Sequence, residues 1–83
     1  MKVTEAQRLL VQLLKISGMD QETTVGIILM LKDSQEATKE MLLWLDKFNP
    51  EKKELTEEQQ NGIMEKFQEI IQNNTHTVLA SWR

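Results

Sequence analysis

The stretch that decides the fold is 25–31, Val-Gly-Ile-Ile-Leu-Met-Leu, which no polar side chain interrupts. A helix that is apolar on every side is normally buried, whereas a surface helix keeps a polar face. The β-branched residues Val25, Ile27 and Ile28 make a strand the competing interpretation. A helix is favoured because no second strand-like run is present for pairing, and an isolated strand is not stable. Gly26 costs roughly 1 kcal/mol relative to alanine in mid-helix, and we interpret it as a notch for a neighbouring helix.

The segment before this stretch has the pattern of an amphipathic helix with recognisable ends. Thr4 and Gln7 have capping-box spacing, and Gly18 stands where a left-handed residue commonly ends a helix. These signals predict a first helix over about 4–17. Asp20 is then placed to cap the helix that contains the apolar stretch.

Two further helices are expected after the apolar stretch. Either Asp33 or Ser34 can cap the first of them, and Asn49 ends it because a residue before proline avoids helical angles. Thr56, with a glutamine three residues later, begins the last helix. The core stripes of the three amphipathic helices are Val3, Ala6, Leu10, Leu13 and Leu14, then Ala37, Met41, Trp44, Leu45 and Phe48, then Ile63, Met64, Phe67, Ile70 and Ile71. We therefore expect an all-α single domain over 1–83, a four-helix bundle around a buried central second helix.

The segment 73–83 leaves two alternatives open. Val78 and Trp82 continue the apolar stripe of the last helix in phase, although the residues around His76 are poor helix formers. Either the last helix runs on to about Ser81, or a short fifth helix packs the end of the chain against the core. A helix of about 25 residues would be about 38 Å long and would overhang a domain of this size. We expect 73–83 to serve in packing or self-association.

Composition bounds the class of protein. The chain has 83 residues, of which 40% are hydrophobic and 28% charged, as in an ordinary small globular domain. It has no cysteine, which excludes disulfides and thiolate metal sites. The first residues do not resemble a signal peptide, and the apolar runs are far shorter than the ~20 residues that cross a bilayer. A cytoplasmic protein with no membrane contact is expected.

Catalytic and metal chemistry find little support in the sequence. The single histidine, His76, has no carboxylate within a helical turn, and there is no cysteine or tyrosine. A nucleophile needs a base that a third group orients, and this set is missing. The carboxylates lie on polar helix faces, where Asp46, close to Phe48, is only a weak candidate for acid–base work. We expect no enzyme, no cofactor and no bound metal.

The leading hypothesis is a non-enzymatic protein that acts through protein–protein contact or self-association as a homodimer. Its candidate contact residues are Val78, Leu79 and Trp82, followed by Met30 and Trp44, because tryptophan is enriched at binding hot spots and methionine suits adaptable surfaces.

The alternative is a DNA-binding regulator of helix-turn-helix type, formed by the second and third predicted helices. Its recognition residues would be Ser34, Gln35, Thr38 and Lys39, near the start of the third helix. The net charge of −3 and the absence of a basic stripe disfavour nucleic acid as a partner.

Overall fold

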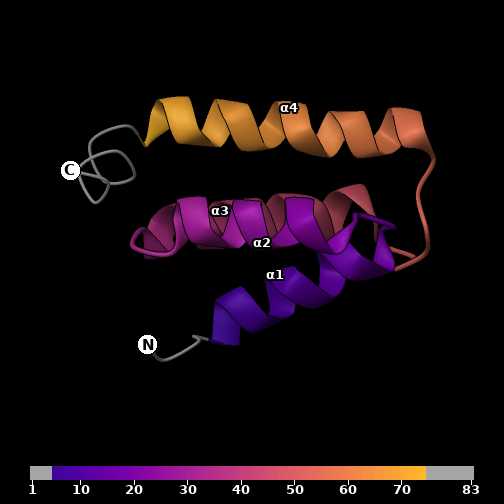
Figure 1. Ribbon diagram of the computed structural model, residues 1–83, viewed down its shortest axis with the longest axis horizontal. Coiled ribbons are helices and arrows are strands. Elements are labelled where there is room, and N and C mark those ends of the chain that lie inside the picture. The colour runs from indigo at the N-terminus through magenta and orange to yellow at the C-terminus, as the bar shows by residue number, and fades with distance from the viewer. Residues whose placement is uncertain (1–4, 75–83) are drawn as a thin grey trace.

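The computed structural model describes residues 5–74, which form four α-helices joined by short connections (Figure 1). The helices are α1 (Glu5–Ile16), α2 (Gln21–Leu31), α3 (Gln35–Phe48) and α4 (Glu57–Asn73). Successive helices run in opposite directions, with α4 along one side of α3 and α1 on the other side. The predicted all-α four-helix architecture is confirmed, and residues 5–74 contain no strand.

The turn after α1 has the predicted glycine geometry. Gly18 adopts a left-handed φ of 96°, and its N–H donates to the Lys15 carbonyl at 3.0 Å. The Met19 N–H donates to the Leu14 carbonyl at 3.1 Å, which completes a Schellman motif. Met19 is buried by this reversal, so the turn both ends the helix and adds a side chain to the core.

The remaining helices begin at capping residues that the sequence indicated. Asp20 accepts a hydrogen bond from the Thr23 N–H, and Ser34 rather than Asp33 caps α3 through the Ala37 N–H. At α4, the Gln59 N–H donates to Thr56 Oγ1 at 3.2 Å while the Thr56 N–H donates to Gln59 Oε1 at 2.9 Å. This reciprocal pair is the predicted capping box. The expected Thr4 cap of α1 lies outside the described residues.

The centre of the bundle is α3, not α2. Helix α3 packs against all three other helices, whereas α2 packs against α1 and α3. Only Thr24, Ile27 and Leu31 of α2 are buried. The expectation of a buried central second helix is therefore wrong. Its apolar pattern identified a helix without a polar face, but a bundle of this size supplies α2 with neighbours on its inner side only.

The glycine in α2 also differs from its predicted role. Among residues 5–74, no atom would lie within 4 Å of a Cβ added to Gly26, so no helix of this part of the chain approaches the glycine closely.

The last helix ends earlier than one of the two alternatives required. Helix α4 ends at Asn73, and the N–H of Asn74 donates to the carbonyls of Ile70 and Ile71. The Asn74 side-chain amide donates to the Ile70 carbonyl at 2.8 Å, which satisfies the end of the helix. The alternative of a helix that continues to Ser81 is not found. A fifth helix would lie outside the described residues.

Candidate functional site

An apolar groove of about 340 Å³ lies between α1 and α3. The buried side chain of Leu13 lies among its lining residues, and Leu42 is half-buried. Leu9, Ile16 and Leu43 also line it and are 42%, 41% and 63% exposed. An exposed aliphatic surface that is also hollowed is typical of a site that binds another molecule.

The groove exists because the apolar stripe of α1 is wider than its neighbours can cover. Leu10 and Leu14 are completely buried in the core, whereas Leu9 and Ile16 flank them on the side of the groove. Leu9 and Ile16 widen the apolar stripe of α1 beyond the five residues that the sequence pattern assigned to the core. A helix that faces one core needs a stripe of little more than 100°, so the extra width was the available signal for a second surface.

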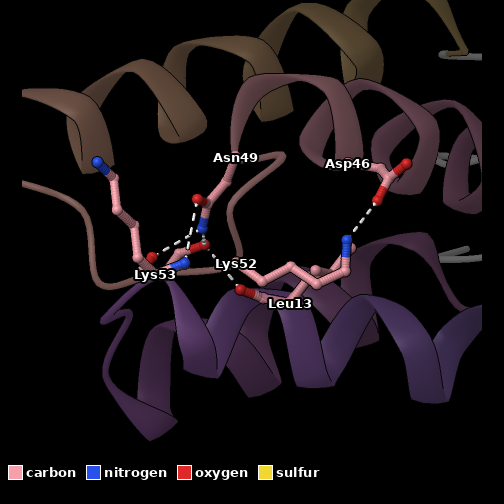
Figure 2. Close-up of polar contacts among 6 residues, drawn as sticks. Leu13, Asp46, Asn49, Lys52 and Lys53 are labelled. Atoms are coloured by element: carbon pink, nitrogen blue, oxygen red, sulfur yellow. Dashed lines mark hydrogen bonds and ion pairs between the residues drawn. The ribbon is translucent and has the colours of Figure 1, made fainter.

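Charged and polar side chains form the rim of the groove. Lys52 Nζ lies 2.9 Å from Asp46 Oδ1, and both side chains are about half exposed. Figure 2 shows Lys52 reaching from the α3–α4 connection to Asp46 on α3. Lys52 holds a left-handed φ of 52°, which turns the chain back beside the end of α3. An exposed ion pair of this kind contributes only about 0–1 kcal/mol to stability, so the fold depends little on it.

A buried polar junction fixes the end of α1 beside the end of α3. The Asn49 side-chain amide donates to Ser17 Oγ at 3.0 Å and to the Lys53 carbonyl at 2.8 Å, and Ser17 Oγ donates to the Leu13 carbonyl at 2.7 Å. Asn49 and Ser17 are 1% and 0% exposed. Figure 2 shows Asn49 and the Lys53 backbone above α1, where Leu13 lies. The junction thereby sets the spacing of α1 and α3 at one end of the groove.

From the sequence, Asn49 was expected only to end a helix. Its partner Ser17 is 32 positions away, and side-chain pairing at that separation leaves no periodic signal. The only local hint was an amide directly after the end of a helix, where a side chain can satisfy free backbone groups.

Only two of the five predicted contact residues are among those that the structure describes. Val78, Leu79 and Trp82 are outside the described residues. Met30 and Trp44 are half-buried and pack against the core, and the Trp44 ring stacks on Phe48 with centroids 4.5 Å apart. Neither Met30 nor Trp44 lines the groove between α1 and α3. Their role in binding stays a prediction, while the residues that give this groove its exposed apolar surface were not among the candidates.

The fold buries two of the four residues of the helix-turn-helix hypothesis and leaves the other two exposed. Ser34 is buried as the cap of α3, and Thr38 Oγ1 donates to the carbonyls of Leu31 and Ser34. Gln35 and Lys39 are exposed and line a cavity of about 200 Å³ near the start of α1. Two of the four side chains are therefore engaged within the chain.

The described residues offer no grouping for metal chemistry and no membrane span. Residues 5–74 bring together no set of three histidine, cysteine, aspartate or glutamate side chains suited to a metal ion. None of the helices in this part of the chain combines the length and apolar character that crossing a bilayer requires. Comparison of the chain with family models, with curated proteins and with solved structures gives no match.

Proposed function

We propose that this chain is a non-enzymatic helical protein that acts through protein–protein contact, and that its groove between α1 and α3 binds an amphipathic helix of another protein. The observation that carries the proposal is the set of exposed aliphatic side chains in this groove, above all Leu43 at 63% exposure. A cytoplasmic location, expected from the sequence, belongs to the same proposal.

The form of the groove favours a helical partner. Two neighbouring helices form its walls, and an amphipathic helix buries its apolar face in a groove of this kind through residues at helical spacing. Gln12, Asp46 and Lys52 at the edge suit the polar flanks of such a helix, because the rim of a protein interface is polar while its centre is apolar.

The test uses Leu43→Glu, which places a charge in the apolar centre of the groove. Tagged wild-type chain and variant are incubated with native cell extract and washed at low and then high salt. We expect wild type to retain a protein through the high-salt wash and the variant to lose it, because apolar contacts resist salt and an unpaired buried charge opposes binding. Leu43 is the most exposed large apolar residue described, so the helical circular dichroism signal should be unchanged.

The matched control is Gln68→Glu, which adds the same charge at an exposed position of α4, away from the groove. This control should retain the partner as wild type does. Equal capture by wild type and Leu43→Glu would contradict the groove as the binding site. Capture of nucleic acid that leaves at high salt would instead favour the helix-turn-helix alternative.

A further inference from the structure

The outer face of α2 presents a second apolar surface. Val25 and Leu29 are each 47% exposed, and Gly26 beside them carries no side chain. A helix that is apolar on every side is normally buried on every side. Within the described residues the fold buries only the inner side of α2, so the apolar pattern of 25–31 is explained only in part by one copy of the chain.

The outer face has the spacing of a helix-pairing seam. Glu22, Val25, Leu29 and Lys32 are separated by steps of three, four and three, which are the steps between a and d positions of a heptad. Lys32 keeps helical angles, with φ −56° and ψ −35°, so the seam extends to it. The two apolar residues occupy the middle of the seam, and one acidic and one basic residue occupy its ends.

The charges at the two ends of the seam favour a second copy of the chain as the partner, and they favour antiparallel pairing of the two α2 helices. In an antiparallel pair centred at residue 27, Glu22 lies opposite Lys32 of a second copy, and Val25 lies opposite Leu29 of the second copy. Two-fold symmetry repeats each contact. A parallel pair would place Glu22 beside its own counterpart, and like charges in an interface oppose association. Among residues 5–74 neither Glu22 nor Lys32 belongs to an ion pair.

We infer that two copies of this chain form a homodimer through antiparallel α2 helices. The second helix also covers a shallow hollow of about 170 Å³ between α1 and α2, to which Val11 and Ile28 contribute apolar surface. This surface is separate from the groove between α1 and α3. The residues of α1 that line the groove include Leu9 and Ile16, whereas Val11 lies on another side of the helix.

The first test measures association by sedimentation equilibrium across the micromolar range. We expect wild type to show a monomer–dimer equilibrium and Leu29→Glu to sediment as a monomer with an unchanged helical signal. Leu43→Glu, the same change at an exposed leucine of the other surface, should dimerise as wild type does. A wild-type chain that is monomeric throughout this range, or a Leu29→Glu variant that dimerises equally well, would overturn the dimer.

The second test examines the direction of pairing through an exchange of charge. Glu22→Lys and Lys32→Glu should each weaken dimerisation by roughly fivefold or more, because each change creates two repulsive contacts in the symmetric dimer. The double variant should return the dissociation constant close to the wild-type value. Glu65→Lys on α4 is the control for a change in net charge and should have no effect. A double variant no better than the single variants would refute antiparallel α2 pairing.

Discussion

Asp20 begins α2 with a carboxylate that the folded chain keeps ionised. Hydrogen bonds from the side chain and then the backbone N–H of Thr23 lower the pKa of Asp20 below its ordinary value. The unfolded chain lacks these bonds and binds the proton more readily. The capping contribution is therefore complete above the unfolded pKa of about 3.9, and it is lost as the pH falls through the lower pKa of the folded state.

This linkage predicts the behaviour of Asp20→Asn. Asparagine is an equally good N-cap but does not titrate, so wild type should lose thermal stability relative to the variant as the pH falls from about 5 to about 2. Melting temperatures measured by circular dichroism across this range test the prediction. Asp33→Asn is the control, since Ser34 and not Asp33 caps α3. A difference in melting temperature between wild type and Asp20→Asn that stays constant with pH would contradict the prediction.

At the scale of the element, two glycines should respond in opposite ways to replacement by a residue with a Cβ. Gly18 needs its positive φ, and an added Cβ would lie 2.8 Å from Gln60 Nε2. Gly26 lies in the interior of α2, and an added Cβ there would meet no atom of the described part of the chain within 4 Å. The effect of a substitution at Gly26 on stability therefore depends on helix propensity alone. At Gly18 it depends on both backbone strain and close contact.

Gly26→Ala should raise the free energy of unfolding by about 0.5–1 kcal/mol, because alanine is the better residue in a helix interior. Gly18→Ala should lower it by about 1–2 kcal/mol, the cost of a left-handed backbone for a residue with a Cβ. Urea denaturation in dilute solution, where self-association is minimal, measures both. A Gly26→Ala variant less stable than wild type would contradict the prediction, because it would mean that the added methyl group disturbs a contact at this position.

The boundaries of these elements could be predicted from local chemistry, but the exposure of α2 could not. Gly18, Ser34 and Thr56 act through hydrogen bonds within a few residues, so the sequence contains the whole of each motif. Burial of Val25 or Leu29 depends instead on how many other helices reach α2. An apolar pattern shows that a face avoids water without showing whether the same chain or another one covers it.

The same limit applies to the candidate site at the scale of the whole molecule. The predicted core was largely correct, since Leu10, Met41 and Ile63 are completely buried, but Phe48, which was predicted to lie in the core stripe of α3, is 37% exposed. The groove between α1 and α3 was not predicted, because it depends on the position of the two helices and not on the pattern of either. The junction of Ser17 and Asn49 helps to set this position, and it joins the end of α1 to the connection between α3 and α4.

Asn49→Ala should therefore destabilise the whole molecule by about 2 kcal/mol. The change removes the donor to Ser17 Oγ and the Lys53 carbonyl, together with the acceptor of the Lys53 N–H, and loss of one partner from a buried polar group costs about 1–3 kcal/mol. Chemical denaturation monitored by circular dichroism measures the effect. The control is Asn61→Ala, at an exposed position of α4, which should be neutral or slightly stabilising because alanine favours the helix. Equal stability of the two variants would show that the junction contributes nothing to the packing of α1 against α3.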